Sequence, residues 1–136
     1  MSPDQPMSFD TDEIEQAFGR LAGPTHLPSL TARERQRFLA EQLTPWVEQL
    51  VARFDLDTRM IPPCWARHNG MVEALSALRD HERACYSETA APTSALDWFR
   101  ALREIEARLV DQGAGTRCSI TEHRESPAAR WTGQPR

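Results

Sequence analysis

The residues with the clearest chemical potential are two cysteine–histidine pairs. Cys64 and His68 are separated by three residues in "CWARH", and Cys118 and His123 by four residues in "CSITEH". Together they offer two thiolates and two imidazoles, a ligand set that zinc accepts in a tetrahedral arrangement. Ordinary zinc fingers pair cysteine with cysteine and histidine with histidine, whereas here each pair is mixed and the two lie far apart. A zinc-stabilised regulator using these four residues, contacting DNA through arginines, is therefore kept as an alternative interpretation.

The Cys64–His68 pair also admits a catalytic and a purely structural interpretation. A thiolate–imidazolium pair is a nucleophile, and a Cys–His enzyme is a further alternative. The sequence contains no "GxSxG" motif and no glycine-rich phosphate loop, so we assign no catalytic residue and expect a protein that is not an enzyme. In the structural interpretation Cys64 is a small buried residue, Cys118 lies in a mobile tail, and His68 bonds to backbone or packs against Trp65.

Four tryptophans in a short chain suggest contacts with a partner. Trp46 and Trp98 fall on apolar stripes of helical period, which favours the core. Trp65 lies in a connection and could anchor that loop or a partner. Trp131, in "AARWTGQPR", has no apolar neighbours, so it is either an exposed anchor or a residue without a role. The predicted partner-binding residues are Trp65, His68 and Trp131.

The elements that must position these residues are helices. Thr31 and Glu34 form a capping-box pattern, after which apolar residues recur at helical spacing from Leu39 to Phe54. Pro45 lies inside that stripe, and we predict a kink in one long helix. A second helix is predicted from a capping Asn69 to near Tyr86, and a third from residue 94 to the "DQGAG" stretch. A short helix is predicted to begin at residue 10 or 11.

The predicted fold is therefore all-α, with three long helices and a short N-terminal helix packed as a small bundle. The expected boundaries are 1–9 disordered, 10–111 helical domain and 112–136 mostly disordered tail. The length of 136 residues suits one domain. So small a core would gain from self-association, so a homodimer is among the expected partners.

Composition excludes several classes of protein. Hydrophobic residues make up 40% and charged residues 26%, which is typical of a globular chain, and no apolar run is long enough to span a membrane. We expect no signal peptide and a cytoplasmic location. The three cysteines argue against a disulfide framework. The net charge of −4 makes nucleic acid an unlikely partner.

The stretch "WVEQLVARFDLDTRMIPPCWARHNGMVEALSALRDH" resembles a family of small actinobacterial proteins of uncharacterised function, often encoded on phages, plasmids and integrative elements. The resemblance covers roughly residues 45–110. It rests on a Pro-Pro-x-Trp-x-x-His turn between helices and on these matching positions: Trp46, Pro62, Pro63, Trp65, His68, Glu73, Leu75, Ala77, Leu78 and Trp98. It implies a helical accessory protein of a mobile gene set and brings no catalytic residues. The leading interpretation is a non-enzymatic protein–protein interaction or oligomerisation module with an unknown protein partner.

Overall fold

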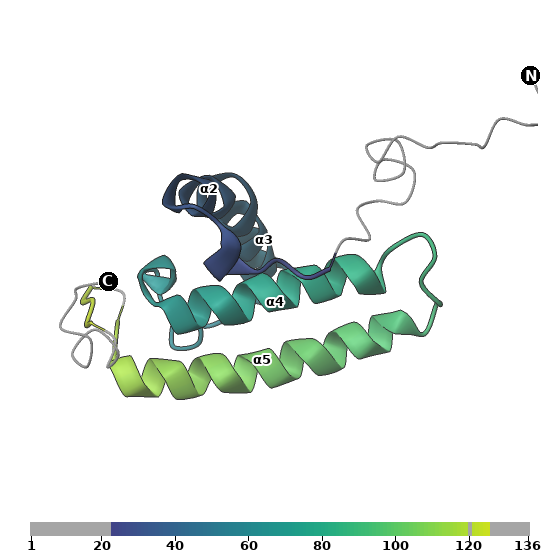
Figure 1. Cartoon of the computed structure of the whole chain (residues 1–136). Helices are drawn as coiled ribbons and strands as arrows, with labels where there is room; N and C mark the ends of the chain where they lie inside the picture. Colours follow the sequence, from purple (N-terminus) through teal and green to yellow (C-terminus); the bar gives the residue numbers. More distant parts are fainter. Residues whose placement is uncertain (1–22, 120, 126–136) are drawn as a thin grey trace, which may run out of the picture.

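The computed structural model describes residues 23–119 and 121–125, and this part of the chain is helical without a β-strand (Figure 1). The predicted all-α bundle with three long helical elements is confirmed. The helix predicted from residue 10, the disorder predicted for residues 1–9 and Trp131 lie outside the described residues. The elements in chain order are η1 (Leu27–Ser29), α2 (Ala32–Phe38), η2 (Leu39–Leu43), α3 (Thr44–Phe54), η3 (Trp65–Arg67), α4 (Asn69–Cys85) and α5 (Ser94–Thr116).

The first long element stays helical from α2 through η2 to α3, as the apolar stripe predicts. Its start is the predicted capping box, in which Glu34 N–H donates to Thr31 Oγ1 at 3.1 Å and Thr31 N–H donates to the Glu34 carboxylate at 3.2 Å. Pro45 is accommodated in the first turn of α3 because the preceding η2 is a π-helix, in which Thr44 N–H bonds to Leu39 O. The wider turn absorbs the irregularity that a proline imposes.

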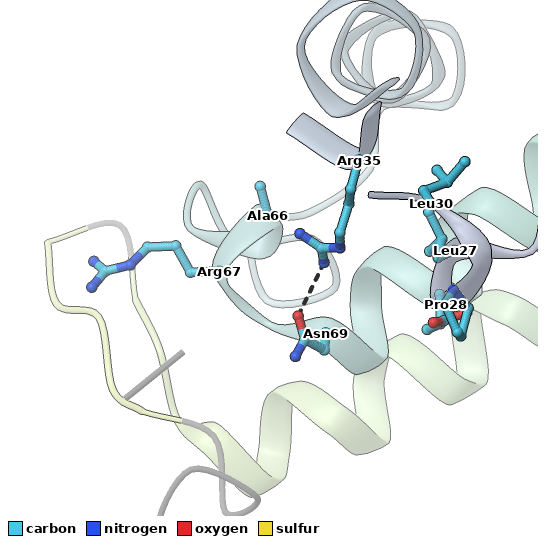
Figure 2. Close-up of a pocket in the computed structure, with 8 residues that line it drawn as sticks. Leu27, Pro28, Leu30, Arg35, Ala66, Arg67 and Asn69 are labelled. Atoms are coloured by element: carbon cyan, nitrogen blue, oxygen red, sulfur yellow. Dashed lines mark hydrogen bonds between the residues drawn. The ribbon is translucent and has the colours of Figure 1, made fainter. Parts of the chain in front are cut away.

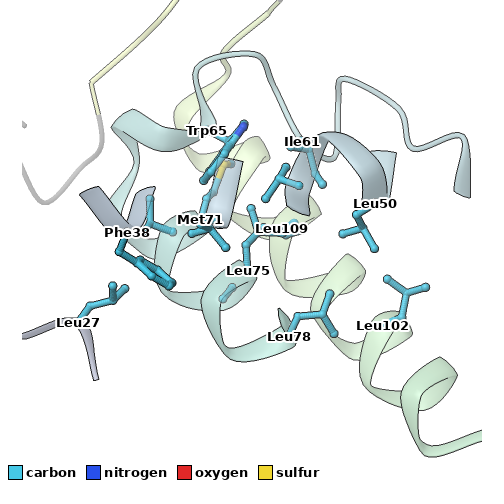
Figure 3. Close-up of a cluster of buried hydrophobic side chains, with 14 of the residues drawn as sticks. Leu27, Phe38, Leu50, Ile61, Trp65, Met71, Leu75, Leu78, Leu102 and Leu109 are labelled. Atoms are coloured by element: carbon cyan, nitrogen blue, oxygen red, sulfur yellow. The ribbon is translucent and has the colours of Figure 1, made fainter. Parts of the chain in front are cut away.

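The core lies where α4 and α5 run side by side and α3 crosses them (Figures 1 and 3). The chain reverses through residues 86–93, so α5 returns along α4. Each fully buried leucine contributes roughly 1.5–3 kcal/mol to folding. The buried hydrophobic residues come from every helix of the described chain, and those with no exposed surface at all are Leu43, Met71, Val72, Leu75 and Trp98.

The tryptophans predicted for the core are found there. Trp98 is fully buried, and Trp46 is partly buried against the core. Their rings meet edge to face with centroids 6.5 Å apart, a favourable aromatic geometry. Trp46 Nε1–H donates to Glu82 at 3.0 Å, and Arg53 bonds to the same carboxylate at 3.0 Å. These bonds link α3 to α4.

The start of α4 differs from the sequence prediction. His68, not Asn69, is the N-cap residue, and its side chain makes no capping bond to the helix. Asn69 is the first helical residue, and its Oδ1 accepts a hydrogen bond from Arg35 at 3.1 Å. The preference of asparagine for the N-cap position is not realised here. His68 has the extended backbone of an N-cap residue, and the Asn69 side chain bonds to Arg35 of α2 instead.

The end of α5 also differs, because the helix continues past residue 111 to Thr116. The sequence predicts a stop at the glycines of "DQGAG", but they lie inside the last turns of the helix. Gly113 allows close packing, since a Cβ there would lie 3.0 Å from the Arg59 carbonyl oxygen. The helix ends at Arg117, whose backbone is left-handed with φ of 59° and whose N–H bonds to Gly113 O at 2.8 Å. No helix within residues 23–119 and 121–125 is long and apolar enough to cross a membrane.

Candidate metal centre

Two segments that are distant in sequence bring four potential metal ligands together. Cys64 and His68 come from the turn before α4, and Cys118 and His123 come from the segment after α5. One ligand atom from each side chain lies within 4.8 Å of all the others. Zinc bonds to nitrogen and sulfur hold neighbouring ligand atoms roughly 3.3–3.8 Å apart in a tetrahedron. The cluster is therefore close enough to bind a metal ion after a small contraction.

The first pair is positioned by a tightly bonded turn. Trp65 N–H bonds to Pro62 O at 2.9 Å, Arg67 N–H to Cys64 O at 2.9 Å, and His68 N–H to Trp65 O at 3.0 Å. These bonds form η3 and place the two side chains on one side. His68 Nε2 lies 3.5 Å from Cys64 Sγ and 3.2 Å from Cys118 Sγ. Nε2 is therefore the nitrogen of His68 that faces both thiols.

The second pair lies on a compact turn. Ser119 N–H bonds to Glu122 O at 2.8 Å, and Glu122 N–H bonds to Ser119 Oγ at 3.0 Å. This reversal brings His123 Nδ1 to 3.9 Å from Cys118 Sγ. Arg124 N–H also donates to Cys118 Sγ at 3.2 Å, a bond that becomes stronger when the sulfur is a thiolate. The turn falls in the segment for which the sequence predicted little order.

The electrostatics disfavour charge on the first pair. Burial, reinforced by the neighbouring Cys118, raises the pKa of Cys64 to about 11. Burial, followed by repulsion from His123, lowers the pKa of His68 below its ordinary value of 6.5. At neutral pH the metal-free site therefore holds a neutral thiol beside a neutral imidazole. A divalent cation would reverse this preference for the thiol, because a metal stabilises the thiolate.

Two further side chains, Glu125 and Arg67, lie beside the cluster, and the sequence analysis did not predict either as part of the site. Glu125 Oε1 lies 3.3 Å from His123 Nε2, and an Arg67 guanidinium nitrogen lies 3.8 Å from the same carboxylate oxygen. The available signal was an acid two residues after a candidate ligand histidine. It could not be used because spacing alone does not show which nitrogen faces the carboxylate.

The structure places two of the three predicted partner-binding residues in the interior. Trp65 is 7% exposed and His68 is 2% exposed. Trp65 packs in the core beside Met71 (Figure 3), and His68 faces the two thiols. Neither side chain offers much surface to a partner in this conformation.

A hollow of about 560 Å³ lies beside the centre, between η1, α2 and the start of α4 (Figure 2). Leu27, Leu30 and Ala66 form part of its wall, and the Arg35–Asn69 hydrogen bond spans its polar side. Arg67 lies at its rim, but the side chain extends away from the hollow toward the segment after α5 (Figure 2). None of the four candidate ligands lines this hollow.

Compared with models of protein families, with curated proteins and with solved structures, the chain shows no match. The resemblance to small actinobacterial proteins therefore stays a prediction, and the function must be argued from the site itself.

Proposed function

We propose that this chain is a non-enzymatic helical interaction module stabilised by a structural zinc site of Cys64, His68, Cys118 and His123. The observation that supports the proposal is the convergence of these four ligands from two distant segments within 4.8 Å. The mobile-element origin and the accessory role rest on the resemblance of residues 45–110 to the actinobacterial family.

The donor set favours zinc over other common ions. Two thiolates and two imidazoles are soft or borderline ligands, whereas magnesium and calcium take oxygen ligands. Four protein ligands also complete a tetrahedron, which is typical of structural zinc, while catalytic zinc sites keep a position for water. Arg124 N–H donates to Cys118 Sγ at 3.2 Å, a contact that a thiolate ligand keeps, whereas the bond from the protonated thiol to Arg124 O at 3.4 Å is lost when the thiolate forms.

A Cys64–His68 enzyme is less well supported. A nucleophilic cysteine needs a lowered pKa, and here burial and Cys118 raise the pKa of Cys64 to about 11. The distance of 3.5 Å between Cys64 Sγ and His68 Nε2 suits a nucleophile and base, but Cys118 Sγ lies closer to the same nitrogen, at 3.2 Å. Two thiols that face the same imidazole nitrogen are better explained as metal ligands than as a nucleophile and its base.

The interaction role is supported by apolar side chains left on the surface. Leu96, Phe99 and Val110 of α5 are exposed, as is Tyr86 just after α4. Large apolar side chains at a surface are available to a partner, which is either another protein or a second copy of this chain.

The test is the metal content of the protein purified under reducing conditions. We expect about one zinc per chain in the wild type and less than about a tenth in Cys64→Ser and Cys118→Ser, because losing one thiolate opens the tetrahedron. Cobalt should substitute for zinc and give the visible absorption of a tetrahedral site with thiolate ligands.

Cys85→Ser is the matched control, since Cys85 lies at the far end of α4 and is not in the cluster. It should keep the zinc and the cobalt spectrum of the wild type. A wild-type protein that holds no zinc and gives no tetrahedral cobalt spectrum would refute the proposal.

A further inference from the structure

The two nitrogens of His123 face different partners. Nδ1 points toward Cys118 Sγ at 3.9 Å, and Nε2 lies 3.3 Å from Glu125 Oε1. If Nδ1 carries the lone pair that binds the metal, Nε2 must carry the proton, and it is then the donor to the carboxylate. A carboxylate that accepts from the outer nitrogen of a ligand histidine fixes the tautomer and the ring orientation.

Glu125 is itself held by Arg67 from the other segment of the centre, at 3.8 Å. Arg67 directly precedes the ligand His68, and Glu125 follows the ligand His123 by two residues. The Arg67 and Glu125 side chains are 58% and 42% exposed, so their ion pair adds little to folding stability. The position of this ion pair matters more than its energy, because Arg67 adjoins the first ligand pair and Glu125 adjoins the second.

We infer that Glu125 is a positioning residue of the metal centre, which holds His123 with Nδ1 toward the metal, and that Arg67 positions Glu125. This inference rests on the proposed zinc site. It assigns the neighbouring acidic residue Glu122 no such role, because Glu122 pairs with Arg124 at 3.3 Å and makes no bond to a ligand side chain. Glu122, three residues before Glu125, can therefore serve as the control residue when Glu125 is substituted.

The experiment measures zinc affinity by competition with a chromophoric chelator in the full chain. Glu125→Ala should bind zinc about tenfold or more weakly than the wild type, which is the usual effect of removing such a carboxylate. Glu125→Gln keeps an acceptor oxygen without the charge and should fall between these two. Glu122→Ala should stay within about twofold of the wild type, as expected for an exposed residue that bonds to no ligand.

A second measurement separates positioning from a general loss of structure. In the zinc-loaded wild type, nitrogen NMR should show His123 bound through Nδ1, with a protected proton on Nε2. Glu125→Ala should lose that protection, and Glu122→Ala should keep it. Arg67→Ala should weaken zinc binding less than Glu125→Ala, because it acts through Glu125.

The outcomes distinguish the two proposals. If the wild type binds no zinc, the proposed function fails. If the wild type binds zinc but Glu125→Ala and Glu122→Ala bind it equally well, with the Nε2 proton of His123 unchanged, the zinc site stands and the positioning role of Glu125 is overturned.

Discussion

At the residue scale, Cys64 and His68 show how the cluster behaves without a metal. Burial is the first cause of both shifts, which raise the pKa of Cys64 and lower the pKa of His68. Both shifts keep the group neutral. The metal-free fold therefore holds Cys64 and His68 side by side in their neutral forms, and the thiol proton of Cys64 is removed only when the metal binds.

These shifts predict the pH dependence of the metal-free protein. His68 has a lowered folded-state pKa, so its contribution to the free energy of unfolding is present above 6.5 and is lost as the pH falls through the folded value. Cys64 has a raised folded-state pKa, so its contribution is present below 9.0 and is lost as the pH rises toward about 11. Melting temperatures in chelator and reductant should therefore form a plateau between these limits.

The variant Cys64→Ala tests the alkaline side of that plateau. Its melting temperature should decline less steeply above pH 9.0 than that of the wild type, whatever its absolute stability. Some decline should remain, because the pKa of Cys85 is also raised by burial. An equal slope in both proteins would mean that folding does not raise the pKa of Cys64.

At the element scale, two glycines near the end of α5 offer a matched comparison. Gly115→Ala meets nothing within 4 Å, so it should stabilise the protein by up to about 1 kcal/mol through helix propensity. Gly113→Ala places a Cβ 3.0 Å from the Arg59 carbonyl oxygen. That carbonyl belongs to a turn held by bonds from Met60 and Ile61 to Asp57 O, so it cannot move easily.

We expect Gly113→Ala to be at least about 1 kcal/mol less stable than Gly115→Ala in urea unfolding, since the same propensity gain is offset by a close contact. A Gly113→Ala protein as stable as Gly115→Ala would show that the turn at Arg59 gives way, and that the packing of α5 against it is loose.

The helices themselves were predictable because apolar spacing is a local property. The stripe from Leu39 to Phe54 ran through Pro45, and the chain is helical there. The two errors at helix ends arose where tertiary contacts outweigh local preference. His68 takes the N-cap position while its side chain faces two thiols, and Gly113 continues a helix that glycine usually ends. Neither contact is visible in a pattern of neighbouring residues.

At the scale of the whole molecule, the centre is a consequence of helix length. α4 has 17 residues and α5 has 23, and the two are joined by a short reversal. At about 1.5 Å per residue, α5 extends roughly 9 Å farther than α4. The end of α5 therefore passes the start of α4 and delivers Cys118 to the turn that carries Cys64 and His68. The four ligands could be named from the sequence, but their meeting depended on α5 reaching Thr116.

A metal bound at this place should stabilise the fold as a whole, because it joins segments fifty residues apart, as between His68 and Cys118. A ligand that binds only the folded state adds about 2.7 kcal/mol when its free concentration is a hundred times its Kd. For a domain of this size that is a rise in melting temperature of roughly 10 °C. Zinc should produce this rise, a chelator should reverse it, and Cys118→Ser should show neither effect.

Limited trypsin digestion gives the matching local measurement. Zinc should slow cleavage after Arg117 and Arg124, which flank the second ligand pair and are exposed, because binding holds that turn against the start of α4. Cleavage after Arg100, on the exposed face of α5 far from the centre, should change less. Zinc that binds at one per chain and changes neither the melting temperature nor cleavage after Arg117 would show a site uncoupled from folding, and the structural role proposed here would be wrong.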